Sequence, residues 1–240
     1  MNYTIDQGNT HTKGASFDHD HLSETFIWKT DHDVIKYFEQ IQGASIIICS
    51  VSGNPQSLND IIGQQNKITI LDHQTSLPIM SFYESPETLG MDRIAVACGA
   101  SYLYPNETCL IVDMGTCITY ELIDSAKNYH GGAISPGFKM RFSAMHNQTK
   151  RLPLISDAIE EGLIGKSTNG SMVSGVLNGI TSEIEGFILR FKEQFGELKV
   201  ILTGGDSHRF ESKIKAPTFV APNLVHIGLN SILRHNEGSA

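Results

Sequence analysis

The sequence has few basic residues, few cysteines and no long apolar run, and each shortage excludes a class of protein. Its 240 residues include 18 lysines and arginines against 26 aspartates and glutamates, for a formal net charge of −8. A chain of this charge lacks the basic face with which proteins displace counterions from nucleic acid. Its longest apolar run, residues 46–51, is far too short to cross a membrane. We therefore expect a soluble globular protein whose partners include no nucleic acid and no membrane.

The four cysteines, at positions 49, 98, 109 and 117, include no Cys-x-x-Cys pair. Three of them lie in apolar patterns, where a small buried side chain is the common role. No basic leader followed by an apolar stretch opens the chain, because Asp6 interrupts the first apolar run. These features predict a reducing, cytoplasmic location without a signal peptide.

What the sequence does contain is a short apolar stretch that ends in Asp-x-Gly. It occurs twice, as IDQGNT at 5–10 and as VDMGT at 112–116. The two aspartates, Asp6 and Asp113, lie 113 − 6 = 107 positions apart, about the length of a small domain. Residues 109–122 read as two antiparallel strands joined by a tight turn. The turn offers a glycine that lets backbone approach a bound group, a hydroxyl and a carboxylate, which together suit a phosphate and its cation.

One Asp-x-Gly turn is ordinary hairpin chemistry. Two of them at domain spacing predict two related halves that face one cleft, which we divide as domains 1–107 and 108–240. The sequence contains no Gly-x4-Gly-Lys-Ser/Thr run, the phosphate loop of Walker-type kinases. Phosphate binding is therefore expected at the two Asp-Gly turns.

The first half reads as a β-meander followed by an α/β unit. The predicted strands are 3–5, 12–17, 24–28, 44–51 and 67–71, and the predicted helices are 31–41 and 56–62, with a turn at 52–55. The hairpin tip Asp-His-Asp-His at 18–21 has two interpretations, a metal site and the far more common solvated turn.

A further helix is predicted from 91 to 104, and Asp92 lies at or just before its start. An aspartate there can simply cap the helix, with Arg93 solvated. Alternatively, the carboxylate is a base for a substrate hydroxyl, and the guanidinium is a fork for a substrate carboxylate. The spacing alone leaves both interpretations open.

In the second half, residues 130–137 contain four glycines and prolines and are predicted as a loop that closely approaches a ligand or another backbone. The strand at 199–202 ends in Thr203-Gly204-Gly205-Asp206. Backbone N–H groups of such a glycine pair suit a nucleotide phosphate, although a plain tight turn is equally compatible. The predicted helices are 138–147, 171–195 and 223–234.

Taken in order, the motifs resemble those of the type III pantothenate kinases over residues 3–232. They are Asp6-x-Gly8-Asn9-Thr10-x-x-Lys13, Gly90-x-Asp92-Arg93, Asp113-x-Gly115-Thr116-x-x-Thr119, Gly131-Gly132-x-Ile134-x-Pro136-Gly137, Gly165-Lys166-Ser167-Thr168 and Thr203-Gly204-Gly205-Asp206. The resemblance implies an α/β fold of two ribonuclease H-like domains around a nucleotide cleft, as in the acetate and sugar kinase, Hsp70 and actin superfamily. It also implies a homodimer that transfers the γ-phosphoryl group of ATP to the primary hydroxyl of pantothenate, the first step of coenzyme A biosynthesis.

The resemblance also implies roles for individual residues. Asp92 would be the general base, and pantothenate would be bound by Tyr83, Gly90, Met91, Asp92, Arg93 and Thr168. ATP would be bound by Asp6, Gln7, Gly8, Asn9, Thr10, His11, Thr12, Lys13 and Thr116, with Gly204 and Gly205 bordering its adenosine. Asp6 would hold magnesium through water, and Asp113 would bind a monovalent cation, potassium or ammonium. Gln7 departs from the family pattern, which has an aliphatic residue in that slot.

Two other functions fit the same motifs. A non-catalytic relative would bind nucleotide or pantothenate and regulate a protein partner, but it would not need Asp6, Lys13, Asp92, Arg93 and Asp113 together. A kinase of the same superfamily would act on a sugar or a short acid, and the charge pair at 92–93 fits a hydroxy acid better than a neutral sugar. In the expected dimer, the helix 171–195 and the loop 131–137 are our candidates for the interface.

Overall fold

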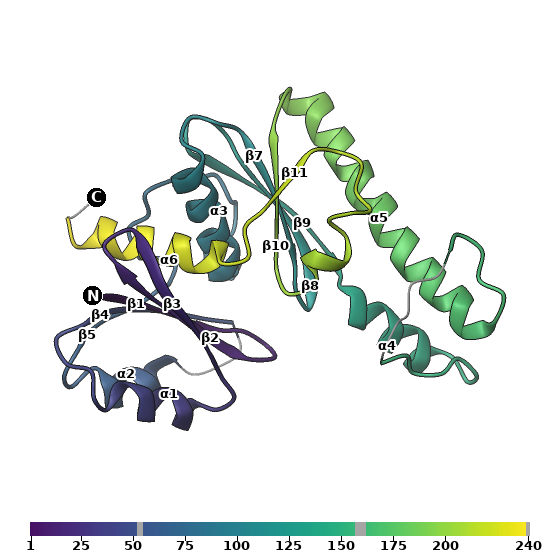
Figure 1. The fold of residues 1–240 in the computed structure, drawn as a ribbon. Coiled ribbons are helices and arrows are strands. Elements are labelled where there is room, and N and C mark those ends of the chain that lie inside the picture. The colour runs from purple at the N-terminus through teal and green to yellow at the C-terminus, as the bar shows by residue number, and fades with distance from the viewer. Residues whose placement is uncertain (52–54, 157–161, 239–240) are drawn as a thin grey trace. The chain divides into compact units, whose positions relative to one another are not determined.

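The computed structural model describes residues 1–51, 55–156 and 162–238, which contain both strands and helices (Figure 1). The strands are β1 (Asn2–Gln7), β2 (Thr12–Asp18), β3 (His21–Trp28), β4 (Ser45–Ser50), β5 (Lys67–Ile70), β6 (Met80–Ser81), β7 (Cys109–Met114), β8 (Cys117–Ile123), β9 (Asn128–Pro136), β10 (Lys199–Thr203) and β11 (Thr218–Val220). The α-helices are α1 (Asp31–Phe38), α2 (Pro55–Ile62), α3 (Met91–Leu103), α4 (Phe138–Gln148), α5 (Thr168–Phe195) and α6 (Leu224–Asn236). Two short 3-10 helices span Pro86–Thr88 and Ser207–Arg209.

The strands form two sheets that repeat one topology. The first sheet has the order β3-β2-β1-β4-β5, in which β1, β2 and β3 are antiparallel neighbours while β4 and β5 run parallel to β1. The second has the order β9-β8-β7-β10-β11, with β10 parallel to β7 and to β11, and β6 added at its edge beside β9. Counted within each half, both sheets have the strand order 3-2-1-4-5. The predicted pair of ribonuclease H-like halves is therefore confirmed.

The chain packs as two compact units that are not continuous in sequence. The first unit comprises Met1–Glu107, Glu121–Gly131 and Asn223–Ala240, and the second comprises Thr108–Tyr120 and Gly132–Pro222. The first unit thus takes back the end of β8, the start of β9 and the whole of α6. The predicted domain boundary at 107/108 separates the two related halves of the sequence, and it stays a prediction. The compact units differ from these halves because Glu121–Gly131 and Asn223–Ala240 pack with the first unit.

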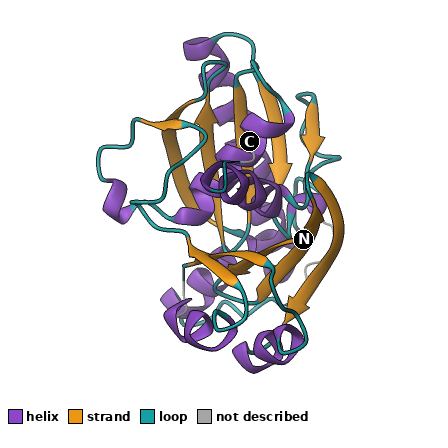
Figure 2. Cartoon of the chain, turned by 90° about the vertical axis from the view of Figure 1, so that its left-hand side faces the viewer, coloured by secondary structure: helices purple, strands orange, loops and turns teal. Residues whose placement is uncertain are grey.

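In the first unit, helices cover both faces of the five-stranded sheet (Figures 1 and 2). Helices α1 and α2 pack on one face, where Val34, Phe38 and Leu58 join buried strand residues such as Ile46 in one apolar core. The first helix begins at a capping box, since the Thr30 hydroxyl accepts a hydrogen bond from the Asp33 backbone N–H and the Asp33 carboxylate accepts one from Thr30. Helices α3 and α6 lie against the other face.

Helices α3 and α6 touch each other backbone to backbone. A side chain at Gly228 of α6 would overlap the carbonyl oxygen of Ala95 in α3, and one at Gly99 of α3 would overlap the carbonyl oxygen of Leu224. Two glycines at this crossing therefore permit a contact that any larger residue would prevent. Helix α6 also reaches β1, because the buried His226 shares a hydrogen bond of 2.7 Å between its Nδ1 and Thr4 Oγ1.

The second unit has its own core, between its strands and α5. The buried face of α5 includes Val173, Ile180 and Ile184, which pack with strand residues such as Val112 and Leu202. The helix starts at Ser167, whose hydroxyl accepts a hydrogen bond of 3.0 Å from the Gly170 backbone N–H. It ends at Gly196, which has a left-handed φ of 78°.

The glycine-rich stretch at 130–137 was predicted as a loop, and this prediction is wrong, because residues 128–136 form strand β9. The glycines serve close packing within the strand. Gly131 has a φ of 81°, and a side chain there would lie 3.1 Å from Cδ2 of Tyr83. A side chain at Gly137, just after the strand, would overlap the carbonyl oxygen of Thr116. The short strands β6 and β11 were not predicted, and most of the turn predicted at 52–55 lies outside the described residues.

Candidate active site

The first Asp-Gly turn joins β1 to β2 and leaves its polar groups accessible. Asp6 lies opposite Lys13 in the register of the two strands. The turn is closed by a hydrogen bond of 3.2 Å from the Gly8 N–H to the His11 carbonyl oxygen, while the side chains of Asn9, Thr10 and His11 are exposed. An exposed turn beside a carboxylate and an ammonium group can bind a phosphate and its cation.

Gln7 fills the slot where the resemblance expects an aliphatic side chain, and the structure explains the substitution. The residue is buried, and its Nε2 donates a hydrogen bond of 3.0 Å to Oδ1 of Asp31 at the start of α1. The amide therefore ties the first Asp-Gly turn to the first helix.

The carboxylates of Asp6 and Asp92 lie within electrostatic range of each other in the first unit. Burial and the charge of Asp92 raise the pKa of Asp6 to about 6, and Lys13 opposes the rise. Cys49 lies opposite Asp6 on β4, and burial together with both carboxylates raises the pKa of its thiol. This part of the site is thus rich in negative charge, which a bound cation would relieve.

Asp92 is not the cap of α3, so that interpretation is wrong. The cap position belongs to Gly90, and Asp92 lies in the first turn of the helix. Its Oδ1 accepts a hydrogen bond of 2.9 Å from the Arg93 backbone N–H. Burial raises the pKa of Asp92, although the Arg93 N–H and the Arg93 charge act against the rise. The absence of a side chain at Gly90 leaves space for this carboxylate, because a Cβ there would come within 2.5 Å of Oδ1.

Arg93 is buried rather than solvated. Its Nε and Nη2 donate to the two carboxylate oxygens of Glu121, at 2.6 Å and 3.0 Å. Its Nη1 donates to the Tyr83 hydroxyl at 3.3 Å, and the guanidinium carbon lies 5.4 Å from the centroid of the Tyr83 ring. Glu121 also accepts a hydrogen bond of 2.6 Å from the Tyr129 hydroxyl. The fork that was expected for a substrate carboxylate is occupied by a carboxylate of the protein.

In the second unit, the turn between β7 and β8 repeats the first. The Gly115 N–H donates to the Cys117 carbonyl oxygen at 2.9 Å, and the Gly137 N–H donates to the Thr116 carbonyl oxygen at 3.1 Å. Thr116 itself is exposed. Asp113 lies at the end of β7, as Asp6 does near the end of β1, and the repeat predicted from sequence is present.

Gly204 supports Asp113 directly. It has a φ of 86°, and a side chain there would overlap Oδ1 of Asp113 and the backbone of Met114. This glycine therefore leaves room for the Asp113 carboxylate, while the adenosine contact that the resemblance implies stays a prediction. Thr168 is the first residue of α5 and is exposed, and like Asp113 and Thr116 it belongs to the second unit.

The sequence interpretation missed the acids that hold these elements, of which Glu121 is fully buried and Glu183 is partly exposed. Besides Glu121, these include Glu183 of α5, which accepts hydrogen bonds from Tyr120 at 2.9 Å, from Ser135 at 2.5 Å and from Arg141 at 2.6 Å. A signal existed for the first of them, because Glu121 is the one acid inside the apolar run 118–123. A charge buried in such a run requires a partner.

The metal interpretation of the tip at 18–21 receives no support from the described residues, among which there is no group of three or more His, Cys, Asp or Glu placed to hold a metal. Asp20 forms an ion pair with Arg234 instead. Magnesium in kinases commonly takes one or two carboxylates and completes its shell with water and phosphate oxygens, so Asp6 fits that role without a larger cluster. Across the residues that are described, no helix is long and apolar enough to span a membrane.

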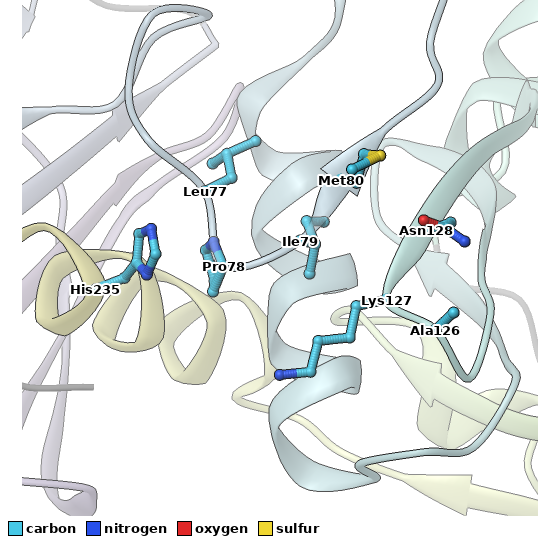
Figure 3. A pocket seen from close by; sticks show the side chains of 8 residues that line it. All are labelled: Leu77, Pro78, Ile79, Met80, Ala126, Lys127, Asn128 and His235. Carbon is cyan, nitrogen blue, oxygen red and sulfur yellow. The ribbon is translucent and has the colours of Figure 1, made fainter.

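A shallow pocket of about 590 Å³ lies elsewhere in the first unit (Figure 3). Its lining is the segment 77–80, the hairpin residues 126–128 and His235. Figure 3 shows the apolar side chains of Leu77, Pro78, Ile79 and Met80 on one segment, with Ala126, Lys127 and Asn128 on the hairpin. The residues predicted for ATP and pantothenate belong to other parts of the chain, so we do not assign the substrates to this pocket.

Solved structures place the fold. A Baf family protein of Campylobacter jejuni, named as a transcriptional activator, superposes with a TM-score of 0.61 at 21% identity over 98% of this chain and 99% of that one. A polyphosphate/ATP-glucomannokinase of Arthrobacter superposes with a TM-score of 0.51 at 12% identity over 98% of each chain. At these identities the likeness concerns the fold alone. Together with the repeated 3-2-1-4-5 sheet and its paired Asp-Gly turns, it defines the fold of the acetate and sugar kinase, Hsp70 and actin class.

Sequence comparison narrows this class. The family model of type III pantothenate kinase matches residues 3–190. The type III pantothenate kinase of Cytophaga hutchinsonii is 42% identical over 98% of this chain and 100% of its own length, and that of Bacteroides fragilis is 40% identical over 99% of both. The chain belongs to the type III pantothenate kinase family.

Proposed function

We propose that this chain transfers the γ-phosphoryl group of ATP to the primary hydroxyl of pantothenate, giving 4'-phosphopantothenate and ADP in the first step of coenzyme A biosynthesis. Family membership names the substrates, and one structural observation carries the chemistry. Asp92 projects from the first turn of α3 within electrostatic range of Asp6, which lies beside the phosphate turn. A base and a phosphate site are thereby held in one compact unit.

The base must accept the hydroxyl proton as the phosphoryl group transfers. Phosphoryl transfer depends mainly on alignment and on charge stabilisation, so a carboxylate that receives the proton late is sufficient. Asp92 is held by its hydrogen bond from the Arg93 N–H, which fixes the carboxylate at the helix start. Its proton acceptance is favoured by the burial that raises its pKa.

We assign ATP to Asp6, Gln7, Gly8, Asn9, Thr10, His11, Thr12, Lys13 and Thr116, and pantothenate to Tyr83, Gly90, Met91, Asp92, Arg93 and Thr168. Exposed polar groups on both Asp-Gly turns support the first assignment. Arg93 contributes to the pantothenate site through Tyr83, because two nitrogens of its guanidinium are bound to Glu121.

Two cations complete the proposal. Asp6 would hold magnesium through water, and the cation would offset the negative charge of Asp6, Asp92 and the ATP phosphates. Potassium or ammonium binds at Asp113, whose carboxylate is fitted against Gly204. No further protein ligand is specified for either ion.

We place the enzyme in the cytoplasm as a homodimer, with no nucleic acid or membrane partner. No disulfide joins the four cysteines, all of which lie among the described residues, and this is compatible with a reducing compartment. The side chains of Leu163 and Ile164, just before α5, are 79% and 78% exposed, and that of Leu189 in α5 is 59% exposed. Exposed apolar side chains of this size support an interface along α5. Sedimentation as a monomer at micromolar concentration would contradict the dimer.

The test is ADP release from purified protein with Mg-ATP, with and without pantothenate, in sodium and in potassium buffer. We expect release that requires pantothenate and increases in potassium. The Asp92→Asn variant is the control for contaminating ATPase. Release that is unaffected by pantothenate, or a sugar phosphorylated faster than pantothenate, would refute the assignment, and absence of release from folded protein would favour a regulatory role.

A further inference from the structure

Glu121 is the most deeply buried acid next to the proposed pantothenate site. Its side chain has no exposed surface, and that of its partner Arg93 is 8% exposed. The pair is bidentate, with both carboxylate oxygens engaged, and the Tyr129 hydroxyl donates to one of them. Burying two charges is costly unless their geometry and hydrogen bonds are nearly ideal. The arrangement therefore fixes the orientation of the guanidinium.

The orientation of Arg93 determines what Tyr83 can do. With Nε and Nη2 bound to Glu121, the remaining nitrogen, Nη1, faces the Tyr83 hydroxyl and donates to it. A phenol oxygen that accepts a hydrogen bond from a cation keeps its own proton for another acceptor. The Tyr83 hydroxyl is thus prepared as a donor.

The Tyr83 ring is held as firmly as its hydroxyl. It stacks at 6.4 Å on the Tyr129 ring, with an angle of 26° between the planes. It also covers Gly131, where a side chain would lie 3.1 Å from Cδ2 of the ring. Glu121 therefore acts on Tyr83 through two neighbours, Arg93 and Tyr129.

We infer that Glu121 is a positioning residue for pantothenate: it withholds the Arg93 fork from the substrate and orients Tyr83, whose hydroxyl donates to an acceptor oxygen of pantothenate. This inference rests on the proposed function, since it assumes that pantothenate binds beside Tyr83. In this arrangement pantothenate receives a hydrogen bond from the neutral Tyr83 hydroxyl and forms no direct ion pair with Arg93.

The experiment measures kcat, the KM for pantothenate, the KM for Mg-ATP and the Tm of wild type, Glu121→Gln, Tyr83→Phe and the double variant. We expect each single variant to raise the KM for pantothenate about ten-fold, the effect of losing one charge-assisted hydrogen bond. The KM for Mg-ATP should change less than about two-fold. Because Glu121 acts through Tyr83, the double variant should also show about a ten-fold increase rather than the product of the two.

The matched control is Glu183→Gln, which breaks a Glu-Arg-Tyr cluster of the same chemistry in the second unit. Its effect should be independent of Tyr83→Phe, so the two should multiply. If Glu121 served stability alone, its variant would lower Tm and leave the KM for pantothenate unchanged, or its effect would multiply with that of Tyr83→Phe. Either result would overturn the inference.

Should Glu121→Gln fail to fold, Tyr129→Phe tests the same arrangement more gently, because it removes one hydrogen bond and leaves the ion pair intact. We expect a KM for pantothenate about three-fold higher, and no further increase when Tyr129→Phe is combined with Tyr83→Phe. An increase that persists in the Tyr83→Phe background would overturn the inference. Wild type without pantothenate-dependent ADP release would overturn the proposed function and this inference together, whereas active wild type with multiplying variants would overturn the inference alone.

Discussion

Replacing Asp6 with asparagine should stabilise the folded protein and abolish its activity. The pKa of Asp6 is raised from 3.8 to about 6 by burial and by the charge of Asp92. A difference of about 2 units, at about 1.4 kcal/mol per unit, corresponds to an upper limit of about 3 kcal/mol of destabilisation by the ionised carboxylate. Asp6 is only half-buried, so solvent screening reduces our expectation to about 1–2 kcal/mol.

The sign follows from proton binding. The folded state binds the Asp6 proton more tightly than the unfolded state, so the ionised carboxylate lowers the free energy of unfolding as pH rises from 3.8 through about 6. The advantage of Asp6→Asn should be complete at pH 7.5, about half as large at pH 5, and absent when Asp6 is protonated in both states. At pH 7.5 the Tm should rise by about 2–8 °C for a chain of this size.

The assay is thermal and urea unfolding in EDTA without nucleotide, at pH 7.5 and pH 5. Asp18→Asn is the matched control, since it removes the same charge from a side chain that is 74% exposed in the same unit, and it should change stability by less than about 0.5 kcal/mol. Adding Mg-ATP should stabilise wild type by ligand linkage and leave Asp6→Asn unchanged. An Asp6→Asn protein that is less stable than wild type at pH 7.5, or whose advantage is the same at pH 5, would refute the reasoning.

Three other substitutions test separate features. Asp92→Asn should lower kcat by about 10²–10⁴ with a native urea transition, and near-normal turnover would remove Asp92 from the mechanism. Gly228→Ala should lower the free energy of unfolding in urea by about 1–3 kcal/mol, because its methyl group would overlap the α3 backbone. The control Gly186→Ala in α5, where the new methyl group meets open space, should be neutral or stabilising. Equal effects of the two substitutions would contradict the packing argument. Gly204→Ala should displace Asp113 and remove potassium stimulation of ADP release, so intact stimulation would exclude Asp113 as the cation site.

Local patterns predicted most of the fold, because most of its helices and strands show their hydrophobic periodicity within a short stretch of sequence. The repeated Asp-x-Gly stretch was visible from spacing alone, and the sheets share one strand order as that repeat implied. The helix beginning at Met91 and the buried strand around 46–49 were likewise readable from periodicity.

Strand β9 was wrongly predicted as a loop because its glycines are required by contacts with residues distant in sequence. Gly131 adopts a positive φ and lies under the Tyr83 ring, and Gly137 lies against the Thr116 carbonyl. Neither partner is near in sequence, so a window that sees only the glycines favours a loop.

The ion pair of Arg93 was not predicted for the same reason, because it depends on a residue distant in sequence. Its partner Glu121 is 28 residues away, on a strand that pairs only once the sheet is assembled. The sequence could show that a lone acid in an apolar run needs a cation, but not which cation would reach it.

The return of α6 to the first unit has a consequence for biosynthesis. This helix touches α3, which carries Asp92, through Gly228, and it touches β1, which carries Asp6, through His226. A nascent chain that has emerged only as far as residue 222 would therefore hold both acids without the helix that braces their elements. We expect the phosphate site to form late on the ribosome, after most of the polypeptide has been synthesised. Truncations that remove residues 223–236 should accordingly disable a site whose two acids lie within the first hundred positions.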